Sequence, residues 1–243
     1  MRVPRIYTEQ ALAAGQSLSL ESGPATHVAR VLRMTAGDAL VLFNGNGADY
    51  PATITSAGKK SVEVSIGAPT DNATESPLVV ELGIGISRGD RMDWVLQKAT
   101  ELGVSAVVPL FTERCEVKLK GERADKKHQH WRQVMISACE QSGRSRLPHL
   151  AAPTSLAHWL ATCSAERRFV LHHRAGTTGE GATPASVALA VGPEGGLSEA
   201  EIIACESAGF EALALGPRVL RTETAPLAAL AIVQARWGDM ALY

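Results

Sequence analysis

The spacing of apolar residues changes near residue 78, and this change limits the folds that the chain can adopt. Before it, residues 38–43 and 61–66 are apolar or alternating segments of strand length, and Asn44-Gly-Asn-Gly47 has the composition of a hairpin turn. Short strands at close spacing favour a small β-barrel. After it, strand-length apolar runs alternate with segments of helical period, which is typical of a mostly parallel sheet covered by helices. We therefore predict a β domain followed by an α/β domain.

Residues 67–77, GAPTDNATESP, separate the two patterns because they contain almost no bulky apolar side chain. A chain of 243 residues is long enough for two domains. We predict a barrel over residues 1–70, a linker over 71–77 and an α/β domain over 78–243.

Two helices of the α/β segment have recognisable starts. Ser198 is followed by Glu201 at the spacing of a capping box, and Thr224 can cap a helix with Pro226 in its first turn. Further periodic segments predict strands at 78–86, 104–110, 169–172, 187–191 and 212–215, and helices at 90–102 and 126–141.

The net charge does not decide whether the chain binds nucleic acid, because 24 Lys and Arg residues face 25 Asp and Glu residues. The charges are unevenly spread, however. Residues 113–146 contain nine basic and five acidic side chains. Such a segment favours an anionic partner on one surface, and a solvated helix face is the alternative.

The cysteines and the termini exclude other classes of protein. Four isolated cysteines, without CxxC or short Cys/His spacing, predict neither a metal site nor a disulfide framework and favour a reducing cytoplasm. The N-terminus has no signal-peptide pattern. The apolar run from Ala225 to Val233 is too short to span a membrane. We expect a cytoplasmic protein with no metal and no membrane segment.

Two glycine-rich turns, residues 191–198 and 215–225, follow short apolar strands. Ligands of open α/β sheets bind beyond the carboxyl ends of the strands, so both turns are candidate cofactor sites. Neither fits the dinucleotide or P-loop fingerprint. Glu194 in the first turn would repel a phosphate, which favours a cofactor that carries positive charge and no phosphate. The alternative for this turn is an ordinary connection between a strand and a helix.

The second turn places Arg218, Arg221 and Glu223 just before a nearly apolar helix. Such a helix is buried, so its entry loop is fixed to the core and its charges need partners. These charges are candidate site residues, and a structural ion pair is the alternative.

Four segments of the chain together resemble one family. GPEGG, LGPRVLRTETA, RMDWVLQKATELGV and EQSGRSRLP are similar to the RsmE-type methyltransferases of bacterial 16S rRNA, which belong to the SPOUT superfamily. The similarity extends from Pro4-Arg5 to Trp237. It implies a PUA-like RNA-binding barrel followed by an α/β SPOUT domain whose chain forms a C-terminal trefoil knot. It also implies a homodimer that uses S-adenosylmethionine to methylate N3 of uridine 1498 in the 16S rRNA of the small ribosomal subunit.

The resemblance also assigns residues to the donor pocket and to RNA contact. By this similarity the donor pocket comprises Leu171, His172, Gly192, Pro193, Glu194, Gly195, Gly196, Leu215, Gly216, Leu220, Thr224 and Ala225. RNA contact is favoured for Arg5, His27, Arg30, Arg33, Arg144 and Arg146, although the barrel residues of this set could also decorate its surface.

The chemistry at uridine N3 suggests two catalytic residues. N3 becomes a good nucleophile only as its proton leaves, so the site needs a base or a cation that stabilises the uracil anion. We predict the cationic role for Arg221, while Glu223 either orients Arg221 or accepts the proton. Two other functions are open: a SPOUT ribose 2′-O methyltransferase, and a non-enzymatic RNA-binding protein of ribosome assembly.

Overall fold

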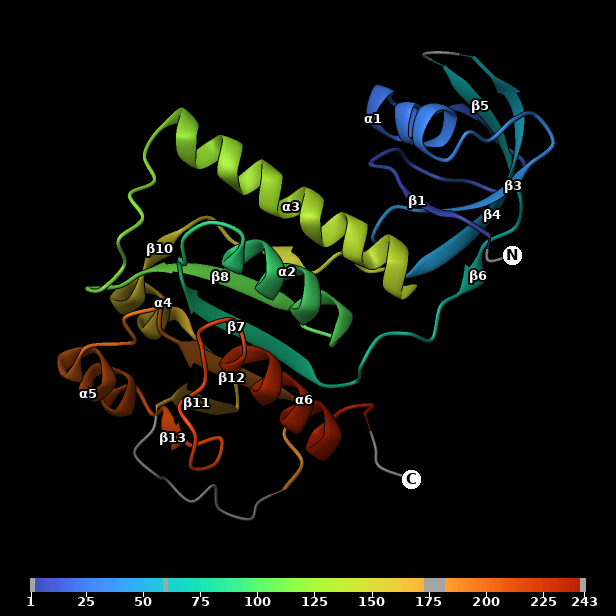
Figure 1. The fold of residues 1–243 in the computed structure, drawn as a ribbon. Coiled ribbons are helices and arrows are strands. Elements are labelled where there is room, and N and C mark those ends of the chain that lie inside the picture. Colours follow the sequence, from blue (N-terminus) through green and yellow to red (C-terminus); the bar gives the residue numbers. More distant parts are fainter. Residues whose placement is uncertain (1–2, 59–60, 173–181, 241–243) are drawn as a thin grey trace. The chain divides into compact units, whose positions relative to one another are not determined.

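The computed structural model describes residues 3–58, 61–172 and 182–240, which form two compact units (Figure 1). The first unit contains Met1–Glu75 and Cys139–Leu147, and the second contains Ser76–Ala138 and Pro148–Tyr243. No helix of the described ranges is both long and apolar enough to cross a bilayer.

The first unit is built on a six-stranded sheet in the order β1-β3-β4-β5-β2, with β6 paired to β4. The pair β1–β3 is parallel, and the other pairs are antiparallel. Its elements are β1 (Arg5–Tyr7), β2 (Ser17–Ser19), α1 (Ser22–Thr26), the π-helical turn η1 (His27–Val31), β3 (Ala39–Phe43), β4 (Ala48–Ala57), β5 (Val62–Ile66) and β6 (Thr70–Asp71).

Alternation of side chains along these strands builds the core of the first unit. Val62, Val64 and Ile66 of β5 are buried while the residues between them are exposed, as the period-two pattern predicts. The predicted hairpin is confirmed, since β3 and β4 pair across the Asn44–Gly47 turn and both of its glycines have positive φ.

Residues 139–147 belong to the first unit, whereas the predicted division places them in the α/β domain. Arg5 donates to both carboxylate oxygens of Asp49, at 2.6 and 2.8 Å, and its Nη2 also donates to the hydroxyl of Ser145 at 2.7 Å. Arg144, itself 5% exposed, pairs with Glu75 at 2.7 Å. These polar contacts join residues 44 to 140 positions apart, which hydrophobic periodicity does not register.

The second unit is an α/β structure with an all-parallel sheet in the order β10-β8-β7-β12-β11-β13, with β9 beside β8. Its elements are β7 (Val79–Gly85), α2 (Arg91–Glu101), β8 (Ala106–Phe111), α3 (Glu122–Ser142), β9 (His149–Leu150), β10 (Thr154–Ser155), α4 (Leu156–Thr162), β11 (Arg167–Leu171), β12 (Ser186–Val191), α5 (Glu199–Ser207), β13 (Glu211–Leu213) and α6 (Ala225–Trp237).

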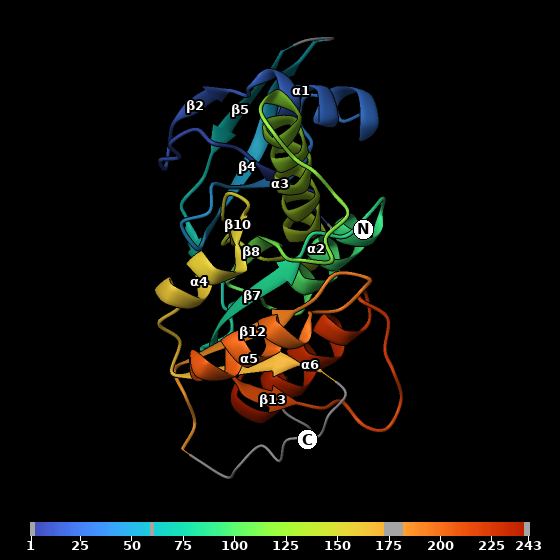
Figure 2. The ribbon, with the colours of Figure 1, turned by 90° about the vertical axis from the view of Figure 1, so that its left-hand side faces the viewer.

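The strand order reverses between β7 and β12. The chain runs outward from β7 through β8 to β10, and then returns so that β12 lies between β7 and β11. Figure 2 shows α4 and α5 on one face of this sheet and α2 and α6 on the other, and each pair of helices is in contact. A reversal of this kind opens a crevice at the carboxyl ends of the strands, where ligands bind.

Of the two helix starts that the sequence predicts from their caps, one makes the expected hydrogen bonds. The capping box of α5 is present as predicted, with Ser198 and Glu201 bonded to each other's backbone N–H. Thr224 precedes α6, but its side chain makes no capping hydrogen bond. The helix α3 begins at Glu122, four residues before the predicted start.

Candidate active site

A cavity of about 300 Å³ lies at the carboxyl ends of β11, β12 and β13. Both glycine-rich turns contribute to its wall, as the position of ligand sites in parallel sheets predicts. Of the twelve predicted donor-pocket residues, eight line it: Leu171, His172, Gly195, Gly196, Leu215, Gly216, Leu220 and Ala225. Their role in binding a donor stays a prediction.

The first turn is compact because its backbone folds back on itself. A Cβ added to Gly192 would lie 2.6 Å from the carbonyl carbon of Gly196 and 2.6 Å from the nitrogen of Leu197. Gly196 has a φ of 68°, and its N–H donates to the Pro193 carbonyl at 2.8 Å. A side chain at Gly192 would displace backbone atoms, and the positive φ at Gly196 favours glycine there.

The second turn is fixed to the first. The Thr222 hydroxyl donates to the Gly192 carbonyl at 2.9 Å. The N–H groups of Thr224 and Ala225 both donate to the Arg221 carbonyl at 2.9 Å, which leads the chain into α6. The two turns, 30 residues apart in sequence, therefore form one wall of the site.

The four other predicted donor residues, Gly192, Pro193, Glu194 and Thr224, do not line the cavity. Glu194 accepts hydrogen bonds from the Arg88 N–H at 2.9 Å and from Arg91 at 3.0 Å. Burial alone would raise the pKa of this carboxyl, but these bonds outweigh it and hold the pKa below its usual value. The argument that Glu194 selects a positively charged cofactor is therefore wrong, because this charge is already compensated on the other side of the turn.

Glu223 also faces Arg91 instead of Arg221. The distance between Glu223 Oε2 and Arg91 Nε is 3.8 Å. Arg221 is exposed, and its side chain has no ion pair within the part of the chain that the structure describes. The hypothesis that Glu223 orients Arg221 is therefore wrong for this conformation, and Arg91 is the residue that connects both turns to the start of α2.

Several cavity residues were not predicted, and some follow a rule that could have found them. They are Arg114, Leu197, Ile202, Leu213 and Val219, whereas Arg218, which also lines the cavity, was a candidate from the sequence. Arg114 follows the end of β8 and donates to the Gly195 carbonyl at 2.8 Å. Leu213 is the last residue of β13. Both positions lie at carboxyl ends of strands, where a side chain reaches the ligand edge of the sheet.

The predicted RNA contacts of the first unit fall into two groups. Arg5 and Arg144 are 10% and 6% exposed at their side chains and are bonded to carboxylates, so neither is free to reach a phosphate. The prediction that Arg5 and Arg144 contact RNA is therefore wrong, and we assign both side chains to packing within the first unit. Arg30, Arg33 and Arg146 are exposed, and His27 is half-buried. Their contact with RNA stays a prediction.

The buried cysteines take no part in reactive chemistry. Burial raises the pKa of Cys139 and of Cys205 to about 12, so both thiols stay protonated at neutral pH. These side chains pack as small apolar groups, as predicted.

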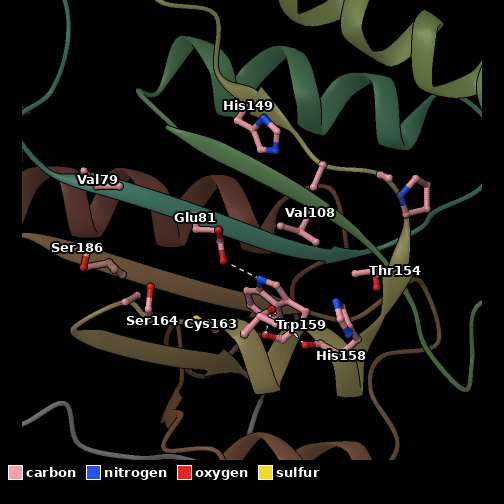
Figure 3. Close-up of a pocket in the computed structure, with 16 residues that line it drawn as sticks. Val79, Glu81, Val108, His149, Thr154, His158, Trp159, Cys163, Ser164 and Ser186 are labelled. Atoms are coloured by element: carbon pink, nitrogen blue, oxygen red, sulfur yellow. Dashed lines mark hydrogen bonds between the residues drawn. The ribbon is translucent and has the colours of Figure 1, made fainter.

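A second cavity, of about 510 Å³, lies near the amino ends of β7 and β12 (Figure 3). Glu81 points into this region and accepts a hydrogen bond from the Trp159 indole N–H at 2.6 Å. A Cβ added to Gly83 would lie only 2.4 Å from the Trp159 ring, so the indole packs directly against the backbone of Gly83. We assign Glu81 to the anchoring of α4 against the sheet.

Comparison with known proteins identifies the family. A family described as RNA methyltransferase domain matches residues 74–234, and one described as RNA methyltransferase PUA domain matches residues 25–67. A ribosomal RNA small subunit methyltransferase E of Buchnera aphidicola is 34% identical over 98% of both chains. The chain belongs to the ribosomal RNA small subunit methyltransferase E family. A Bacillus subtilis member of this family is 31% identical over 93% of both chains.

Solved structures agree with this membership. A ribosomal RNA small subunit methyltransferase E from Neisseria gonorrhoeae, bound to S-adenosyl methionine, has a TM-score of 0.93 and 40% identity, and the match covers 99% of this chain and all of that one. A Legionella pneumophila protein in complex with the same cofactor has a TM-score of 0.95 and 42% identity, and the match covers 98% of this chain and all of the other. The predicted order, a PUA-like domain followed by an α/β RNA methyltransferase domain, is confirmed, while the SPOUT superfamily and the trefoil knot stay predictions from the resemblance.

Proposed function

We propose that this protein transfers a methyl group from S-adenosylmethionine to N3 of a uridine, position 1498, in the 16S rRNA of the small ribosomal subunit. Membership of the methyltransferase E family supports the coarser statement, a S-adenosylmethionine-dependent rRNA methyltransferase. The observation that carries the proposal is the cavity between the two glycine-rich turns.

The walls of this cavity suit the donor. Leu171, Leu213 and Leu220 supply apolar surface of the kind that packs against an adenine ring or an aliphatic chain. A Cβ added to Gly196 or to Gly216 would meet no atom within 4 Å, so open space lies directly beside the backbone. A ligand in the cavity can therefore contact backbone polar groups at the glycines and apolar side chains at the leucines.

The bound donor supplies a methyl group already activated by its positive sulfur, so the task of the chain is alignment and control of one proton. Alignment of the reacting atoms lowers the barrier by avoiding the entropic cost of bringing them together. We assign Arg221 to the stabilisation of negative charge on the uracil ring as N3 loses its proton. For Glu223 we propose the remaining one of the two roles that the sequence suggested, proton acceptance, since its carboxylate does not orient Arg221.

The test is transfer of tritium from labelled donor to small subunits that lack the modification, followed by mapping of the labelled nucleoside by mass spectrometry. We expect label on the base of one uridine, as N3-methyluridine. Label on a ribose would replace this proposal with 2′-O methylation. A chain that binds no S-adenosylmethionine in calorimetry would instead act as an RNA-binding protein of ribosome assembly.

A further inference from the structure

A cleft of about 660 Å³ in the second unit is lined by five basic side chains and one acidic one. We call it the basic cleft; its charged residues are Arg88, Glu116, Lys118, Arg123, Lys126 and Lys127. They come from the β7–α2 connection, the segment before α3 and the first turns of α3. The excess of positive charge therefore comes from three separate segments that meet at one place.

Two of the five basic side chains are not neutralised within the described residues, and two more are neutralised only by exposed pairs; the fifth, Lys127, pairs with Asp93 at 3.3 Å. Lys118 and Arg123 have no ion pair within residues 3–58, 61–172 and 182–240. Arg88 pairs with Glu116, but both side chains are more than 60% exposed. Lys126 lies 3.7 Å from Glu122, and these side chains are 78% and 91% exposed. Exposed pairs of this kind contribute little stability, so they can exchange for an external anion at small cost.

The basic cleft is connected to the first glycine-rich turn and, along the chain, to the donor cavity. Arg88 lines the cleft, and its backbone N–H holds Glu194 in the first glycine turn. Arg114 lines the donor cavity, and Glu116, two residues later, lines the cleft. An anion bound in the cleft would therefore lie next to the turn that shapes the donor cavity.

The apolar residues of the basic cleft indicate which part of a polyanion it contacts. Trp131 is fully buried and Leu119 is 8% exposed, so neither offers a face on which a base could stack. Lys and Arg side chains on open surface are the usual partners of phosphate oxygens. The cleft is thus suited to a phosphate backbone and unsuited to reading bases.

We propose that the basic cleft binds the phosphate backbone of the RNA strand next to the methylated base. This inference rests on the proposed function, because the strand must leave its target base at the donor cavity. Contacts with phosphates contribute affinity that is independent of sequence and falls with salt. The cleft would hold the strand while the donor cavity and Arg221 act on one base.

The test compares two double variants of the full-length protein. Lys118→Gln/Arg123→Gln removes two unpaired charges of the basic cleft. Lys98→Gln/Arg236→Gln is the control, since it removes the same charge from α2 and α6 outside the cleft. Affinity for an unmodified 16S rRNA transcript is measured between 50 and 300 mM salt, roughly the range where phosphate contacts dominate. Donor affinity and melting temperature are measured for both.

For the cleft variant, we expect the slope of log affinity against log salt to fall by about 1.4 to 1.8, which corresponds to two lost phosphate contacts. The KM for small subunits should rise, while the donor affinity and the rate at saturating subunits stay as in the wild type. A wild-type slope and KM in the cleft variant, or equal losses in the control, would overturn the proposal. If the wild type transfers no methyl group, the proposed function fails, and the RNA slopes still test the cleft.

Discussion

A methyl group added at Gly192 would lie 2.6 Å from two backbone atoms of the same turn, whereas one added at Gly195 would lie 3.1 Å from the Arg114 side chain. Backbone atoms cannot move without opening the turn, but a side chain can. We expect Gly192→Ala to lower donor affinity at least tenfold and to reduce the melting temperature. Gly195→Ala should lower donor affinity less.

Calorimetry with S-adenosylmethionine and thermal unfolding measure both effects. Gly195→Val should fall between the two alanine variants in stability, because its larger side chain displaces Arg114 from the cavity wall. Equal donor affinity in Gly192→Ala and the wild type would remove the first turn from the donor site.

We expect the exposed guanidinium of Arg221 to affect the rate of methyl transfer and not the affinity for the donor. Arg221→Ala should lower single-turnover methylation roughly a hundredfold, because it removes a charge that stabilises the uracil anion only as it forms. Donor affinity should stay unchanged. Arg218→Ala is the matched control: it removes the same charge from the same loop, but Arg218 lines the donor cavity, so its effect should appear in donor affinity.

These two arginines separate the possible roles of the loop. A normal saturated rate in Arg221→Ala, combined with a collapse of donor affinity, would assign Arg221 to cofactor binding. Arg221→Lys should recover only part of the rate, since an ammonium group cannot reproduce the planar fork of the guanidinium.

At the scale of elements, the pair Arg5–Asp49 connects β1 to β4 in the first unit. Burial alone would raise the pKa of Asp49, but bonds from Arg5, Ser145 and Asn72 outweigh it and hold the pKa below its usual value. A pKa that is lower in the folded state contributes stability above the unfolded value, and this contribution is lost as pH falls through the folded value. Stability should therefore decline below about pH 4.

Asp49→Asn tests this linkage. At pH 7 we expect a loss of about 3 kcal/mol in the free energy of unfolding, because Arg5 is left buried without its carboxylate partner. The difference from the wild type should shrink at pH 3, measured by urea denaturation. Asp71→Asn, at an exposed site on β6, is the control and should leave stability unchanged. An equal loss at both pH values would contradict the linkage.

Two features with local signals were predicted from the sequence, whereas contacts between distant residues were not. The Asn44–Gly47 turn and the Ser198 capping box depend on neighbours within three residues, so their composition is sufficient. The bond from Arg5 to Ser145 depends on residues 140 positions apart. No periodic pattern records such a contact, and this is why residues 139–147 were placed in the other domain.

In the candidate site, too, residues with local sequence signals were predicted and a residue with distant partners was missed. Glycines of both turns were predicted because a strand end followed by glycine is a local signal. Arg91 was missed because its partners, Glu194 and Glu223, lie more than 100 residues further along the chain. The family resemblance supplied the donor, which residue spacing alone left open.

At the scale of the whole molecule, two large apolar side chains are exposed on helices that pack together. Trp94 on α2 is 52% exposed, and Ile232 on α6 is 49% exposed. Exposed apolar side chains on two neighbouring helices are candidates for a protein interface, and homo-oligomers usually close with two-fold symmetry. We expect a homodimer, with about twice the chain mass of 25.7 kDa in light scattering.

A charge in this patch should separate the subunits. Ile232→Glu is expected to give a mass near that of one chain, because the carboxylate would lose its hydration at the interface. Ile203→Glu on α5, where Ile203 is 55% exposed, is the control and should leave the mass unchanged. A single-chain mass for the wild type at all concentrations would contradict the dimer.

The contribution of residues 139–147 to the first unit also has a consequence for protein synthesis. Arg5 reaches Ser145 and Glu75 reaches Arg144, so the first unit lacks these partners until residue 147 has been translated. At about 5–20 residues per second, the 72 residues between Glu75 and Leu147 take roughly 4–14 s. The N-terminal unit of this enzyme therefore cannot finish folding before residues 76–138 of the other unit have been translated.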